Sequence, residues 1–282
     1  MLIPVSRKAR VAAGKFRARY SVRHHRVIIL FSVLLIGLAG AARSSAAQDC
    51  PTSRSAIDPD RPDITNSPFA LPQGSFQAEN GVAWTAEHGS DVLDAAETRL
   101  RVGVAHCFEL VIDAPLYSFA INGPASSGFS DVVASFKWQL PAVLELDSAA
   151  AAGIEFPSGS HDLSGQGYDP YLQWSWSRDI RDGWGVAGMF SIFWFTGRSS
   201  QNPTFEPTFE VTRDLLPSVG SFVEYVGDYP NHAQPSQVID SGATWRIARL
   251  QQADLHFGFG LNRASPDHFI GFGYSFRLDD LF

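Results

Sequence analysis

This sequence contains few cysteine and lysine residues. Its 282 residues include two cysteines, Cys50 and Cys107, and Lys137 is the only lysine after residue 47. No second Cys or His lies at a spacing typical of metal ligands, so we predict no metal site and no cofactor. In an oxidising compartment the two cysteines predict a disulfide between Cys50 and Cys107, with two unpaired thiols as the alternative.

The chain also lacks the motifs of common enzymes. No serine lies in a Gly-x-Ser-x-Gly elbow, and a serine hydrolase would also need a histidine base and a polar partner. Gly258 and Gly260 lie within an alternating stretch rather than at a strand-to-helix turn, so they do not predict a phosphate-binding loop. We therefore predict that the protein is not an enzyme.

The amino-terminal segment has the parts of a secretory signal peptide. It begins with basic residues and has no acidic residue before Asp49, and it continues with an apolar run from Val27 to Ala42 and the small residues Ser45-Ala46-Ala47. The apolar run is shorter than the roughly 20 residues of a membrane-spanning helix, which disfavours the alternative of a membrane anchor. We predict that residues 1–47 are cleaved after Ala47.

Removal of this segment makes the remaining chain strongly acidic. Residues 1–47 hold nine of the 22 Lys and Arg and none of the 29 Asp and Glu, which leaves 13 basic residues and a formal balance of −16. Such a surface repels the phosphates of nucleic acids, so we predict no nucleic-acid partner.

Apolar and polar residues alternate along most of the chain after residue 75. Leu255, Phe257 and Phe259, for example, alternate with Asp254 and His256. The apolar parity is rich in aromatic residues and the other parity carries charges of both signs, whereas a soluble β-sandwich has shorter strands and a polar outer face. We predict an all-β fold: an antiparallel up-and-down transmembrane β-barrel of about 12 strands over residues 75–282, after an irregular periplasmic segment at 48–74.

The carboxyl terminus supports this interpretation. Tyr274, Phe276, Leu278 and Phe282 share the apolar parity of one predicted strand. This resembles the terminal assembly signal of bacterial outer-membrane barrels. It implies that the protein lies among lipids in the outer membrane of a Gram-negative bacterium, and that the barrel-assembly machinery binds its last strand.

The predicted connections alternate between long and short. Long links are expected at 86–96, 119–129, 157–168, 197–203, 228–236 and 262–267, and short ones at 105–107, 179–183, 213–217 and 248–251. Long outer loops and short periplasmic turns are typical of barrels with an even number of strands. The link at 140–148 is the exception, because it is longer than its position predicts.

Several short strings occur in order from residue 60 to the carboxyl terminus. They are Asp60-Arg61-Pro62-Asp63, Glu109-Leu-Val-Ile-Asp-Ala-Pro115, Phe156-Pro157-Ser-Gly159, Gly165-x-Gly167-x-Asp169, Glu224-Tyr225, Asp240-Ser-Gly242 and Asp254-x-x-x-Gly258-x-Gly260-Leu-Asn262. Together they resemble a family of outer-membrane transporters named for the meta-pathway of phenol degradation. The resemblance implies a barrel associated with the passage of small, often aromatic, compounds.

The inward parity of the predicted strands gathers charged residues that are candidates for lining a water-filled path. They are Glu79, Arg99, Arg101, Glu109, Asp113, Lys137, Glu224, Asp240, Arg246, Asp254 and Arg277. They either set the selectivity of a pore or pair in ladders that fill a narrow lumen. The acidic excess favours cations or neutral solutes over anions.

The string Asp60-Arg61-Pro62-Asp63 precedes the first predicted strand. Asp60, Arg61 and Asp63 could fold into the lumen as a plug, or they could form a capped periplasmic turn. The function predicted for the whole chain is an outer-membrane channel or facilitator for passive diffusion of small solutes, aromatic or hydrophobic ones included. The alternative is a structural or surface-interaction barrel with a closed lumen.

Overall fold

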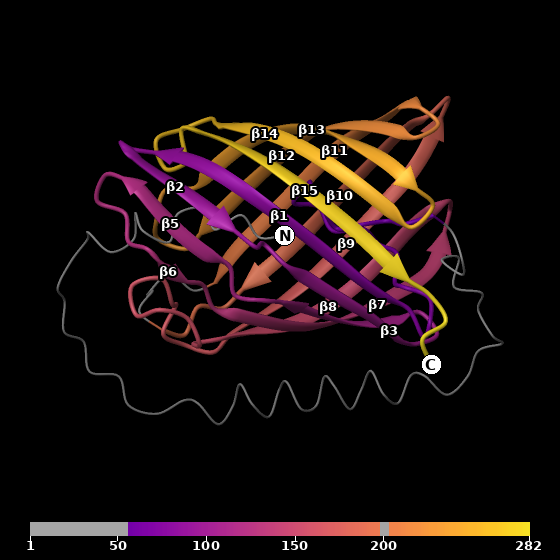
Figure 1. Cartoon of the computed structure of the whole chain (residues 1–282), viewed down its shortest axis with the longest axis horizontal. Helices are drawn as coiled ribbons and strands as arrows, with labels where there is room; N and C mark the ends of the chain where they lie inside the picture. The colour runs from indigo at the N-terminus through magenta and orange to yellow at the C-terminus, as the bar shows by residue number, and fades with distance from the viewer. Residues whose placement is uncertain (1–55, 198–202) are drawn as a thin grey trace. The chain divides into compact units, whose positions relative to one another are not determined.

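The computed structural model describes residues 56–197 and 203–282. These residues form fifteen β-strands in one antiparallel sheet, in which the last strand pairs with the first and closes the sheet into a barrel (Figure 1). Within this part of the chain, no helix is long and apolar enough to cross a membrane.

The strands follow one another around the barrel in chain order. Their bounds are β1 Phe76–Glu87, β2 Ser90–Ala95, β3 Arg99–Ala105, β4 Phe108–Asp113, β5 Tyr117–Asn122, β6 Gly128–Phe129, β7 Val132–Val143, β8 Leu146–Phe156, β9 Asp169–Arg181, β10 Trp184–Phe193, β11 Thr204–Leu216, β12 Val219–Pro230, β13 Ser236–Ala248, β14 Gln251–Gly260 and β15 His268–Leu278. Each of the long strands from β8 to β14 pairs with its neighbours in the sequence, while β7 pairs with β4 and β8, and β15 pairs with β14 and β1.

Three pairs of strands, β2 with β3, β4 with β5 and β6 with β7, behave as single interrupted strands, so the described residues form a closed barrel of 12. β2 continues into β3 across a short break in which Ala96 has a φ of 55°, and Glu97 and Gly81 still exchange backbone hydrogen bonds there. β4 continues into β5, and β6 into β7, in the same way. The predicted all-β, up-and-down antiparallel barrel is confirmed.

Two of the predicted connections differ from the structure. The exceptional link at 140–148 is a two-residue turn at Leu144 and Glu145, because β7 and β8 extend further than their apolar alternation. Both turn residues have φ above 50°, as a type I′ hairpin requires. The link at 86–96 is likewise a tight turn at His88 and Gly89 followed by β2. The short turns after β3, β7, β9, β11 and β13 lie at the barrel end where the described chain begins and ends, whereas the tight turn at His88 and Gly89 lies at the other end.

The distribution of side chains is reversed relative to a soluble protein. On β14, Leu255, Phe257 and Phe259 are 49%, 46% and 54% exposed, whereas Asp254 and His256 are 3% and 1% exposed. Other strands show the same contrast, with exposed aromatic side chains outside and buried charged side chains inside. An outer face of this kind is stable against lipid and unfavourable in water, so the barrel is of the membrane-embedded type.

β15 closes the barrel by pairing with β1 in a register that runs from Leu278 opposite Phe76 to His268 opposite Ala86. The strand ends at Leu278, four residues before the predicted end at Phe282, because the backbone N–H of Leu281 turns to donate to the carbonyl of Gly74. The predicted alternation holds up to that point: Ser275 and Arg277 are buried inside, and Tyr274 and Leu278 are exposed outside.

Candidate functional site

Residues 56–75, which we call the lumen segment, have no regular secondary structure and lie against the inner face of the barrel. Irregular backbone inside a barrel needs partners for its N–H groups. Wall side chains from separate strands supply them. Backbone N–H groups of the lumen segment donate to side-chain oxygens of the wall. The pairs are Asp60 to Glu79 (3.0 Å), Ile64 and Thr65 to Glu224 (both 2.8 Å), Ala70 to Gln139 (3.0 Å) and Leu71 to Glu109 (2.7 Å).

Asp60 is the centre of an ion-pair network. Its carboxylate lies 3.2 Å from Arg99 Nη1, 3.3 Å from Arg101 Nη1 and 3.3 Å from Lys137 Nζ, and the residue is 2% exposed. Burial alone would raise the pKa of Asp60, but the three cations lower it below its usual value. Asp60 is therefore ionised when it is docked, and it holds the lumen segment against β3 and β7.

The same cations also pair with acids of the wall. Glu109 accepts from Arg101 Nε at 3.0 Å and lies 3.0 Å from Lys137 Nζ, while Glu79 accepts from Arg101 Nη1 at 3.1 Å. The wall charges on this side are nearly balanced without the lumen segment, and Asp60 adds one negative charge to them.

Arg61 docks beside this network, at the seam where β15 pairs with β1. Its guanidinium pairs with Glu97 at 3.3 Å and with Asp254 at 3.2 Å, and Arg61 itself is 2% exposed. It lies flat over Gly81 and Gly273, which face each other across the β1–β15 pairing. A Cβ added to either glycine would lie 2.4 Å or less from an atom of the guanidinium, so the barrel seam has a socket that fits Arg61.

Acidic residues gather on β11 and β12. Asp63 shares a hydrogen bond with the carboxyl of Glu210 and lies near Glu224. Burial and these two carboxylates raise the pKa of Asp63 above its usual value. Asp240 lies on the neighbouring strand β13, fully buried and 3.3 Å from His256 Nδ1. The lumen is thus charged asymmetrically, with paired cations and acids around β3 and β7 and an excess of acids on β11 to β13.

The structure brings most of the sequence-predicted residues to the inner face. Those with little or no exposure are Glu79, Arg99, Arg101, Glu109, Lys137, Glu224, Asp240, Asp254 and Arg277. Asp113 lies on the same face and is half-buried, 2.6 Å from Arg99 Nε. Arg277 lies apart from the lumen segment's centre and pairs with Asp279 at 2.7 Å.

Arg246 keeps the inward parity, because it pairs with Gln252, which is buried on the inner face of β14. Its side chain is exposed because it lies near the end of β13, beside the β13–β14 turn. Of the two cysteines, Cys107 lies in the β3–β4 turn, and Cys50 falls outside the described residues.

Sequence reasoning did not single out several residues that hold the lumen segment. Glu97, the partner of Arg61, lies in the interruption between β2 and β3, and Gln139 and Gln173 are uncharged. The two glutamines share the inward parity of Lys137 and Ser175, so a search for all polar inward residues could have found them. Glu97 shares the inward parity of Arg99 and Arg101, so the same search could have found it as well.

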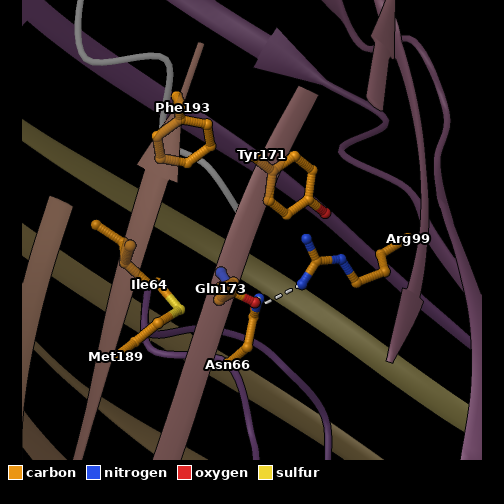
Figure 2. A pocket seen from close by; sticks show the side chains of 7 residues that line it. All are labelled: Ile64, Asn66, Arg99, Tyr171, Gln173, Met189 and Phe193. Carbon is orange, nitrogen blue, oxygen red and sulfur yellow. Dashed lines mark hydrogen bonds between the residues drawn. The ribbon is translucent and has the colours of Figure 1, made fainter. Parts of the chain in front are cut away.

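A small cavity lies between the lumen segment and the wall. Its lining residues are Ile64, Asn66, Arg99, Tyr171, Gln173, Met189 and Phe193 (Figure 2). Its volume of about 10 Å³ is enough for roughly one water molecule. Asn66 bridges the wall, since it accepts from Arg99 Nη1 at 2.7 Å and donates to Gln173 Oε1 at 2.8 Å. Among the described residues, no group of three or more His, Cys, Asp and Glu side chains could hold a metal ion.

Comparisons with known proteins agree with this geometry. The model of the family described as "Putative MetA-pathway of phenol degradation" matches residues 59–278. The chain belongs to this family. No match was found among curated proteins.

Solved structures of outer-membrane proteins share the fold. An outer-membrane channel from Pseudomonas putida F1 superposes with a TM-score of 0.58 at 15% identity, covering 79% of this chain and 100% of that one. The NanC porin has a TM-score of 0.52 at 9% identity, covering 72% of this chain and 100% of the porin. At these identities the likeness concerns the fold, which is that of outer-membrane channels.

Proposed function

We propose that the protein is an outer-membrane channel for passive diffusion of small solutes, aromatic or hydrophobic ones included, and that residues 56–75 act as a plug. This proposal rests on the kind of contacts that hold the lumen segment inside the barrel. Besides a small apolar cluster of Ile64 with Met189 and Val226, the lumen segment is held by ion pairs and hydrogen bonds, with Asp60 and Arg61 at its centre. Water can replace such contacts, so the segment can leave the lumen without unfolding the barrel.

The family and the structural relatives also support a channel function. The family name refers to phenol degradation, and the relative from Pseudomonas putida is an outer-membrane channel. The excess of acids on β11 to β13 favours cations or neutral solutes over anions in the retracted state, in which the lumen segment has left its contacts. Growth of a deletion strain on a panel of aromatic carbon sources tests the choice of solute.

The finer aspects of this proposal concern export and assembly. Residues 1–47 act as a signal peptide cleaved after Ala47, outer-membrane lipid surrounds the apolar face, and the assembly machinery binds β15. We also propose a role without catalysis. The pair of His256 and Asp240 resembles a base and its orienting carboxylate, but no hydrogen-bond partner occupies His256 Nε2 within the described residues.

Single-channel recording on refolded residues 48–282 in planar bilayers tests the proposal. We expect brief conducting events with a preference for cations over anions. A correctly folded barrel that never conducts, even when the contacts of Arg61 are removed, would support the alternative of a structural or surface-interaction barrel. A strong preference for anions would contradict the charge argument.

A further inference from the structure

An apolar surface formed by β9 and β10 lies among the polar residues of the lumen. Tyr171 on β9 and Phe193 on β10 face inward, are each 8% exposed, and have ring centroids 5.5 Å apart. The Tyr171 ring lies over Gly153, where an added Cβ would lie 2.3 Å from the ring, so β8 leaves room for it. Val133 completes this buried cluster, and Met189 continues the apolar surface along β10.

Polar groups border this surface on the side of Arg99. Asp113 occupies Arg99 Nε and Nη2 at 2.6 Å and 3.1 Å. Arg99 Nη1 instead donates to the lumen segment, to Asp60 at 3.2 Å and to Asn66 at 2.7 Å. Gln173 Oε1 accepts from Asn66, while its amide donates to Ser191 at 3.2 Å. Retraction of the lumen segment would therefore leave one donor and one acceptor facing the vacated space.

We propose that Tyr171, Phe193, Met189, Gln173 and Arg99 form a solute-binding site that Ile64 and Asn66 of the lumen segment occupy in the closed channel. Ile64 covers the apolar part, and the amide of Asn66 satisfies the polar part (Figure 2). The lumen segment thus occupies the site as a solute would. Solute and segment compete, so the solute itself shifts the channel toward its retracted state.

The lining defines the chemical class of the solute. The rings of Tyr171 and Phe193 suit a flat ring, and Arg99 Nη1 and Gln173 Oε1 suit a small group that both accepts and donates a hydrogen bond, such as a carboxamide or hydroxyl. Asp113 already balances the charge of Arg99, so the site favours a neutral solute over an anion. This inference rests on the proposed channel function and specifies its solute.

The test uses the complete mature chain in planar bilayers, with benzamide as the probe because it joins a ring to the amide that Asn66 presents. Benzamide should raise the fraction of time spent conducting in a saturable manner. Acetamide lacks the ring and benzoate carries a charge, so both should have little effect at equal concentration. Benzamide that leaves the conducting fraction unchanged or lowers it overturns the inference.

Variants assign the effect to the site. Phe193→Ala should raise the half-maximal benzamide concentration about fivefold, in line with the loss of an aromatic contact. Phe193→Leu keeps apolar volume without the ring and should act in the same direction if the alanine variant folds poorly. Phe190→Ala is the matched control, because Phe190 lies on the same strand but is 42% exposed on the outer face. Equal responses from Phe193→Leu and Phe190→Ala overturn the site.

The outcome also separates this inference from the proposed function. If the wild type conducts but ignores benzamide, the solute site fails and the channel remains. If neither the wild type nor Arg61→Ala conducts, the channel function itself fails.

Discussion

Replacement of Arg61 by alanine should open the channel. The substitution removes the guanidinium that pairs with Glu97 at 3.3 Å and Asp254 at 3.2 Å, and it empties the socket over Gly81 and Gly273. In the retracted state water hydrates both carboxylates, so the substitution weakens docking of the lumen segment and leaves the barrel wall intact.

The size of the effect follows from burial. Breaking a buried ion pair by removing one partner costs about 3–5 kcal/mol, and all three side chains here are at most 4% exposed. Because about 1.4 kcal/mol changes an equilibrium tenfold, the ratio of retracted to docked protein should rise roughly 100- to 4,000-fold. A retracted state populated at about 0.1% would then exceed about 10%.

Single-channel recording measures this fraction directly. Gly273→Ala should act in the same direction without changing any charge, since its Cβ would lie 2.2 Å from Arg61 Nε. Arg246→Ala is the matched control, because it removes an arginine that is exposed outside the network. A folded Arg61→Ala barrel with the conducting fraction of the wild type would show that the lumen segment does not gate.

Two further predictions concern pH and the membrane. When the lumen segment is docked, burial and the carboxylates of Glu210 and Glu224 raise the pKa of Asp63. Docking therefore favours protonated Asp63, and it weakens as pH rises. The fraction of time spent conducting should therefore increase as pH rises from about 4, the usual pKa of a carboxyl group, toward the raised pKa of Asp63. Asp63→Asn should flatten this increase. An Asp63→Asn variant with the pH profile of the wild type would contradict this prediction. Phe257→Arg on the outer face should destabilise the barrel by about 2–4 kcal/mol in denaturant unfolding from vesicles, whereas Phe282→Arg beyond the last strand should cost at most about 1 kcal/mol. Equal costs would mean that Phe257 does not face lipid.

The sequence predicted the barrel well because one physical rule, a side-chain period of two with lipid outside, applies along every strand. It failed where that rule ends. β2 contains Asp91 and Asp94 without aromatic residues, and the run around Leu140 and Val143 does not alternate. Arg246 has the inward parity, opposite Gln252, but it lies near the end of β13, where its side chain is exposed.

The contacts across the lumen could not be predicted at all. Parity gives the face of a residue but not its height, which depends on how far neighbouring strands are staggered around the barrel. The pairing of Arg61 with both Glu97 and Asp254 depends on that stagger. The aromatic surface of Tyr171 and Phe193 escaped notice because inward aromatic side chains break the pattern that identified the other inward residues.

The socket of Arg61 also has a consequence for biogenesis. Asp254 follows Arg61 by 193 residues, and Gly81 and Gly273 meet only when the first and last strands join. Contacts of such long sequence separation form late in folding. Arg61 therefore gains Asp254 and Gly273 as neighbours only when the last strands arrive, so its full set of contacts exists only in the closed barrel. A barrel that joined its edges out of register would offer no place for this arginine.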